Sequence, residues 1–169
     1  MIGNFRLARS EDIARLLDDP EQIEAFLFGE LDENEDGPDP GGMLDVDKAW
    51  HGIHFLLTGT AWEGEPPLDF IVRGGRQIGD VDVGYGPARA FTNEELRDIG
   101  RAIQPISLDT LRSRFDAARM KALKIYPDIW DRDSASDDTL GYLISYYEML
   151  QPFIIKGAAD GFGMIVYLT

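Results

Sequence analysis

Two histidines and an aspartate are spaced so that one helix could bring them to a single metal ion. His51 and His54 are three positions apart, and Asp47 lies four positions before His51. Residues three or four positions apart share a face of an α-helix, so the three side chains could approach one ion. A catalytic zinc ion needs three such protein ligands and one open position. The spacing therefore permits metal-dependent chemistry.

The apolar neighbours of these residues favour a structural role instead. Ile53 and Phe55 flank His54, so we expect His54 to be partly buried and bound by one carboxylate or backbone group. We expect His51 at the surface, and Asp47 could equally cap the helix. We therefore predict no metal site and no cofactor, and we assign no catalytic residue.

An acidic segment resembles the first half of a calcium-binding loop. Residues 32–37 read Asp-Glu-Asn-Glu-Asp-Gly, as an EF-hand loop begins. The glutamate required at the twelfth loop position is replaced by Met43, and the usual aliphatic residue at the eighth by Asp39. Without that glutamate the ion loses two oxygen ligands. We predict that residues 30–43, rich in acids, Gly and Pro, form a mobile acidic loop within the domain.

Two glycine-rich stretches do not match nucleotide-binding loops. Residues 74–79 are not followed by Lys and Ser or Thr, and residues 84–89 lack the third glycine of a dinucleotide-binding fingerprint. The chain also has no Gly-x-Ser-x-Gly motif, which would mark the nucleophile of a hydrolase. We expect these glycines to form turns.

Composition indicates one folded domain with a strong negative charge. The 169 residues are about one domain long, and no cysteine, signal-peptide pattern or long apolar run is present. We expect a single cytoplasmic domain over 1–169 that does not enter a membrane. The net charge is −15, and residues 1–60 carry −10 of it. Such a chain repels phosphate, so we predict that it binds no nucleic acid and that its charge suits a basic protein partner.

Apolar patterns predict a strand at each end of the chain, over 2–8 and, from an unbroken apolar run, over 162–168, with helices between them. Capping signals include a capping box from Thr92 to Glu95, an N-cap at Ser107 and a helix stop at Gly59. One or two short strands are expected between residues 64 and 86. The expected helices are 11–18, 20–28, 46–58, 93–104, one amphipathic helix from Leu108 to before Pro127, and a long helix from about 136 to 161 that Pro152 kinks or restarts. The fold class should be α+β, with a small mixed β-sheet covered by about five helices.

The segment LDVDKAWHGIHFLLTG, residues 44–59, resembles the signature of the YfbM-like family of small bacterial proteins, a domain of unknown function. Weaker similarities extend over nearly the whole chain, including the turn at 85–89 and the stretch at 125–127. The resemblance implies a single YfbM-like domain and assigns no reaction. Residues of this chain that match the family pattern are Asp47, Lys48, Trp50, His54, Leu57, Thr58 and Gly59.

This motif has two interpretations. In the structural one, Trp50 and Leu57 anchor a buried helix, Asp47 pairs with Lys48, and His54 bonds a neighbouring strand. In the functional one, the motif helix and the turn at 85–89 line a pocket where an arginine holds an anionic group and a histidine transfers a proton. The candidate ligand-binding residues are then Asp47, Lys48, Trp50, His54, Tyr85 and Arg89.

These observations lead to two alternative hypotheses about function. The leading hypothesis is a non-enzymatic interaction module whose acidic N-terminal third binds a basic partner. The alternative is a small-molecule or metal-dependent enzyme with its pocket between residues 47–54 and 85–89. Oligomeric state, substrate and partner identity are not encoded in any pattern that we find.

Overall fold

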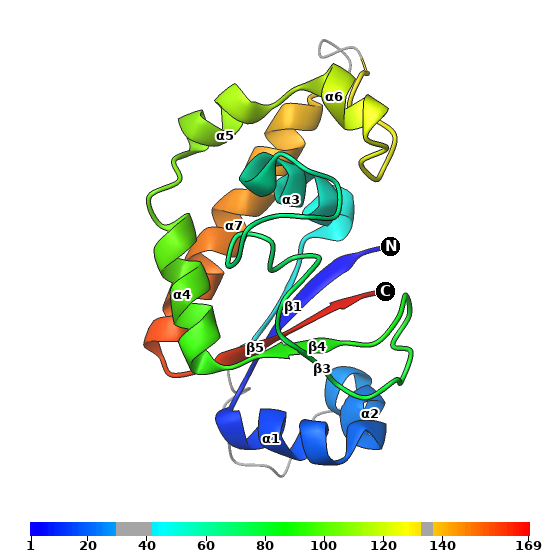
Figure 1. Ribbon diagram of the computed structural model, residues 1–169, viewed down its shortest axis with the longest axis vertical. Coiled ribbons are helices and arrows are strands. Elements are labelled where there is room, and N and C mark those ends of the chain that lie inside the picture. Colours follow the sequence, from blue (N-terminus) through cyan, green and yellow to red (C-terminus); the bar gives the residue numbers. More distant parts are fainter. Residues whose placement is uncertain (30–41, 133–136) are drawn as a thin grey trace.

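The two ends of the chain pair at the centre of a five-stranded antiparallel sheet. The computed structural model describes residues 1–29, 42–132 and 137–169. Strands β1 (Gly3–Ala8) and β5 (Gly163–Leu168) are adjacent, from Gly3 opposite Leu168 to Ala8 opposite Gly163. The sheet order is β2-β1-β5-β4-β3, with β2 at Met43–Asp45, β3 at Arg76–Gln77 and β4 at Arg89–Phe91. Figure 1 shows the chain ends side by side.

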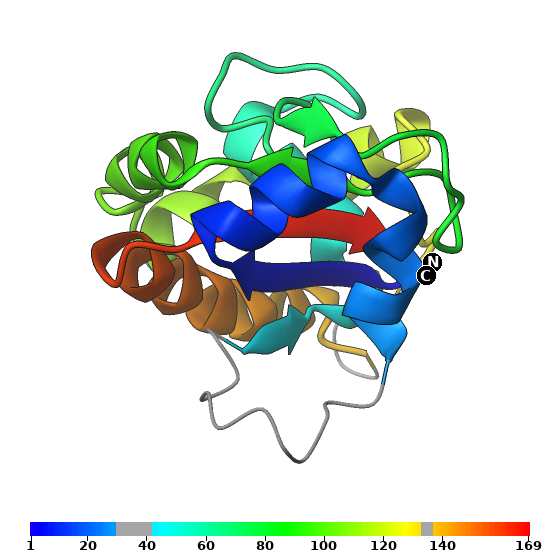
Figure 2. The ribbon, with the colours of Figure 1, turned by 90° about the horizontal axis from the view of Figure 1, so that it is seen from below.

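Helices cover both faces of this sheet (Figures 1 and 2). The first face carries α1 (Ser10–Asp18), the 3₁₀ turn η1 (Pro20–Gln22) and α2 (Ile23–Phe28). The second carries the turn η2 (Asp47–Ala49), α3 (Trp50–Thr58), α4 (Asn93–Ile103), α5 (Leu108–Arg114), α6 (Ala117–Ala122) and α7 (Thr139–Ala159). The predicted α+β class is confirmed, and the described strands pair antiparallel throughout where a mixed sheet was expected.

The sheet separates two hydrophobic cores because side chains alternate along each strand. On β5, Met164 and Val166 belong to the larger core beneath α3, α4 and α7, whereas Ile165 and Tyr167 belong to the smaller core beneath α1 and α2. All four side chains are buried. A strand covered on both faces needs apolar residues at every position, which explains the continuous apolar run that predicted it.

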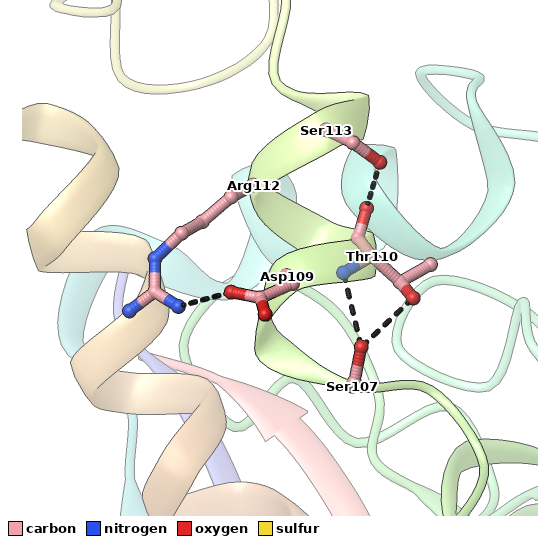
Figure 3. Close-up of polar contacts among 5 residues, drawn as sticks. All are labelled: Ser107, Asp109, Thr110, Arg112 and Ser113. Carbon is pink, nitrogen blue, oxygen red and sulfur yellow. Dashed lines mark hydrogen bonds and ion pairs between the residues drawn. The ribbon is translucent and has the colours of Figure 1, made fainter.

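The single helix expected after residue 107 is wrong, because the chain breaks between α5 and α6. Phe115 is extended, and the Asp116 carboxylate accepts a hydrogen bond from the backbone N–H of Arg119 at 2.9 Å. The apolar spacing continues across this break, so periodicity alone could not reveal it. At the start of α5, Ser107 caps the helix as predicted, and Figure 3 shows its hydroxyl accepting from Thr110 N at 3.1 Å.

The cap at Asp116 should contribute measurably to stability. We expect Asp116→Ala to lower the free energy of unfolding by about 1 kcal/mol, since the first turn of α6 loses a hydrogen-bond acceptor. Urea denaturation checks this. Asp109→Ala is the control, because the Asp109–Arg112 ion pair drawn in Figure 3 is solvent-exposed and should contribute no more than about 0.5 kcal/mol. Equal effects of the two changes would contradict the capping role.

The remaining local predictions have mixed outcomes. The capping box at Thr92 and Glu95 and the left-handed stop of α3 at Gly59 are confirmed, while α7 runs through Pro152 without ending or restarting there. Of the predicted acidic loop and partial calcium loop, residues 30–41 lie outside the described residues, and Met43 belongs to β2. Across the described ranges, no helix is both long enough and apolar enough to span a membrane.

Candidate functional site

The family motif forms η2 and α3, and nearly all of it is buried. Every residue from Trp50 to Leu57 is inaccessible or nearly so, because α3 packs against α5 and α7 within the larger core. A Cβ on Gly52 would clash with Leu143 of α7 and Trp130, so glycine permits this close approach. Trp50 stacks on His51, with 4.8 Å between ring centroids. The motif therefore builds the core.

Asp47 and Lys48 connect η2 to α7 through one tyrosine. The hydroxyl of Tyr142 donates to the Asp47 carboxylate at 2.9 Å and accepts from the backbone N–H of Lys48 at 3.1 Å. Burial and the neighbouring Asp47 charge raise the pKa of Tyr142. The predicted ion pair between Asp47 and Lys48 is wrong, because Asp47 uses its carboxylate on Tyr142 and the Lys48 side chain is in solvent.

His51 is fully buried, so its predicted place at the surface is wrong. The backbone N–H of Tyr126 donates to Nδ1 at 2.9 Å, which leaves the ring proton on Nε2 to be donated to the carbonyl of Ala61 at 2.7 Å. Burial lowers the pKa of His51 and keeps it neutral. Both ring nitrogens are thus used to join α3 to two distant segments, and neither is free for a metal.

His54 is also fully buried, and one of its nitrogens is unsatisfied. Its Nε2 lies 3.3 Å from the Thr58 hydroxyl, whereas Nδ1 has no hydrogen-bond partner among the described residues. The carboxylate or strand partner expected from the sequence is absent among the described residues, and this hydroxyl belongs to the same helix. Burial, together with repulsion from the nearby His51, lowers the pKa of His54 to about 4. A backbone interaction with Glu63 raises this pKa and offsets part of the effect.

Three of the six candidate residues do line one cavity. Trp50, Tyr85 and Arg89 surround a space of about 170 Å³ beside the end of β5, with exposed Trp62 at its edge. His54, Asp47 and Lys48 do not line it. Ligand pockets usually exceed about 300 Å³, so this cavity is too small for most organic substrates.

The guanidinium of Arg89 is already occupied. Its two terminal nitrogens donate to four backbone carbonyls, those of Phe70, Ile71, Arg73 and Gly74. Burial lowers the pKa of Arg89 to about 10, partly offset by the charge of Asp69. Arg89 therefore fastens β4 to residues 70–74 rather than presenting its terminal nitrogens to an anion. Among the described residues, no three His, Asp or Glu side chains are grouped to hold a metal ion.

A larger groove, which sequence reasoning missed, lies between α4 and residues 66–75. It encloses about 630 Å³, and its apolar walls include Phe70, Phe91 and Ile99. Three acids and one base also line it: Asp69, Glu95, Asp98 and Arg101. No local pattern marks these residues, because the groove forms only where the separate segments 66–75 and 91–102 meet in the fold.

A second feature is the acidic face of α1, η1 and α2, which belongs to the acidic N-terminal third of the sequence. We use this name for Asp18, Asp19, Glu21 and Glu24, which are all exposed. The cations of residues 1–29 are engaged elsewhere. Arg9 and Arg15 pair with other acids, and Arg6 lies over the ring of Phe26. The negative charge of the acidic face is therefore not neutralised by the arginines of residues 1–29.

Comparisons with known proteins agree with the fold. The family model described as Domain of unknown function (DUF1877) matches residues 1–167. Protein YfbM of Escherichia coli (strain K12) is 30% identical over 132 residues, covering 76% of this chain and 74% of that protein. The crystal structure of YfbM from Escherichia coli, a protein of unknown function, covers 98% of each chain with a TM-score of 0.71 and 24% identity, and so supports the fold. With its whole length matched in this way, the chain belongs to the YfbM-like family, DUF1877.

Proposed function

We propose that this protein is a non-enzymatic interaction module that binds a basic protein through the acidic face of α1, η1 and α2. One observation carries the proposal: the four carboxylates of that face are exposed, while the three arginines of the same segment are engaged with other groups. Uncompensated charge of this kind attracts an oppositely charged partner and accelerates its association. The net charge of −15 reinforces the attraction.

The enzymatic alternative receives less support from the geometry. Its pocket would be the 170 Å³ cavity, which His54 does not line. Arg89, its expected anion-binding group, already donates to backbone carbonyls. An enzyme needs its reacting groups within reach of one substrate, and these residues do not share an accessible space.

Capture of partners by a charge-neutralised variant tests the proposal. The variant replaces the four acids of the face with amides: Asp18→Asn, Asp19→Asn, Glu21→Gln and Glu24→Gln. We expect the immobilised protein to retain a basic protein from extract of its own organism at about 0.1 M salt and to release it at about 0.5 M, because salt screens exposed charges. The variant should retain at least about tenfold less of this basic protein than the unmodified protein does, because it lacks the four carboxylates that attract the partner.

A matched control separates this face from total charge. It removes four exposed acids elsewhere through Glu94→Gln, Asp109→Asn, Glu148→Gln and Asp160→Asn. We expect it to retain the partner nearly as well as the unmodified protein. Equal retention by the acidic-face variant, or retention that salt does not weaken, would contradict the proposal.

A further inference from the structure

We infer that the groove between α4 and residues 66–75 is a binding site for a small organic cation, and that Asp69 binds its charge. This site is separate from the acidic face and does not depend on the partner proposed there. Its volume of about 630 Å³ lies within the range typical of small-molecule sites. The cavity beside Trp50 is several times smaller.

The groove has apolar walls. Phe70, Phe91 and Ile99 are buried side chains whose surfaces face it, and Pro66, Pro67 and Ala102 complete the lining. Such walls favour a ligand with an aromatic or aliphatic body, because burying apolar surface contributes about 25 cal/mol per Å². They do not by themselves determine what polar group the ligand carries.

Asp69 determines that polar group. It is only 5% exposed, yet its carboxylate forms no hydrogen bond or ion pair with the described residues. Its backbone carbonyl accepts from Val72 N and Arg73 N, which holds the residue in a turn. A Cβ added to Gly64 would lie 2.9 Å from the Asp69 Cβ, so the chain packs closely around it. Because these carboxylate oxygens are not fully enclosed, they remain accessible from the groove that Asp69 lines, where a cationic group could pair with them.

The other charges that line the groove are engaged. Glu95 accepts hydrogen bonds from the backbone and hydroxyl of Thr92, and Asp98 pairs with Arg101 at 2.9 Å. Arg89 influences Asp69 electrostatically but directs its terminal nitrogens at backbone carbonyls. Three acids against one base make the lining negative.

The ligand class follows from these two properties. An amidinium, guanidinium or ammonium group satisfies Asp69, and an apolar body satisfies the walls. A planar amidinium also offers two parallel N–H donors to one carboxylate, the geometry of the strongest charge-assisted pairs. Benzamidinium is therefore a suitable probe, and benzamide is its neutral counterpart of nearly the same shape.

Titration of both probes into the ¹⁵N-labelled full chain, followed by NMR, tests the inference. We expect benzamidinium to shift the amides of residues 68–75 and 95–102 and to bind at least about tenfold more tightly than benzamide, as a charge-assisted hydrogen bond requires. Asp69→Asn should weaken benzamidinium binding by at least about tenfold and leave benzamide unchanged. Asp98→Asn, the control, should alter benzamidinium affinity by no more than about twofold, since exposed ion pairs contribute little.

Further variants keep the test decisive. Ala102→Trp fills the groove while retaining Asp69, and it should abolish the benzamidinium shifts even if Asp69→Asn proves not to fold by circular dichroism. The acidic-face variant should bind benzamidinium as the unmodified protein does, which separates this site from the proposed partner surface. The inference is overturned if the two probes bind equally, if a folded Asp69→Asn binds benzamidinium normally, if Ala102→Trp retains the shifts, or if the shifts map to α1 and α2.

Discussion

Replacing Arg89 with alanine is expected to lower the free energy of unfolding by about 3 kcal/mol, because buried backbone acceptors lose charged donors. Four carbonyls of residues 70–74 accept hydrogen bonds from this one side chain. Urea denaturation measures the loss. Arg89→Lys should recover little of it, since one ammonium cannot reproduce the planar fork of donors.

The control is Arg76→Ala on the neighbouring strand β3. Arg76 is exposed, so removing the same charge there should change stability by no more than about 0.5 kcal/mol. A small stability loss for Arg89→Ala, combined with loss of an anionic ligand, would contradict the structural role and favour the pocket interpretation of the motif.

The second large effect concerns acid. His54 has a pKa of about 4 in the folded protein, against 6.5 without burial. Between these values the unfolded chain binds a proton that the folded protein does not, so the free energy of unfolding falls as the pH falls. His54 should reduce stability by about 3 kcal/mol over this window, at 1.36 kcal/mol per unit of pKa difference. Above pH 6.5 the His54 ring is neutral in both the folded and the unfolded protein, so this loss of stability is absent.

Comparing the protein with His54→Leu isolates this contribution. Carboxylates and His51 titrate in both proteins, so the difference between them reports mainly on His54. We expect urea denaturation to show that the stability of His54→Leu, relative to the unmodified protein, rises by about 3 kcal/mol from pH 7.5 to pH 4. Parallel pH profiles would mean that His54 is protonated in the folded protein as easily as in water.

Local signals predicted much of the fold. The capping box at Thr92, the stop at Gly59 and the apolar run of β5 each depend on residues close together in the sequence, and each is confirmed. The break at Phe115 was missed because apolar periodicity continues across it, although Asp116 is a good capping residue. Short strands such as β4 carry too few residues for a pattern.

The candidate site was harder to predict because its contacts are distant. His51 is buried by partners 10 and 75 positions away, Ala61 and Tyr126, which no local pattern reveals. The motif and the turn at 85–89 do meet, but at a small cavity. Asp69 could not be singled out among 31 acids, since only burial distinguishes it from the others.

These results separate the motif that identifies the family from the surfaces proposed for recognition. The motif is a closed core, and recognition is assigned to the acidic face and the Asp69 groove. NMR detection of the ring nitrogens of His51 and His54 from about pH 8 to about pH 5 tests this separation most directly. We predict that His54 stays neutral, that neutral His51 carries its proton on Nε2 and gains a second proton only at a lower pH than a free imidazole, and that benzamidinium shifts neither ring. Protonation of either ring near pH 6.5, or a shift of His54 on adding the probe, would contradict the account.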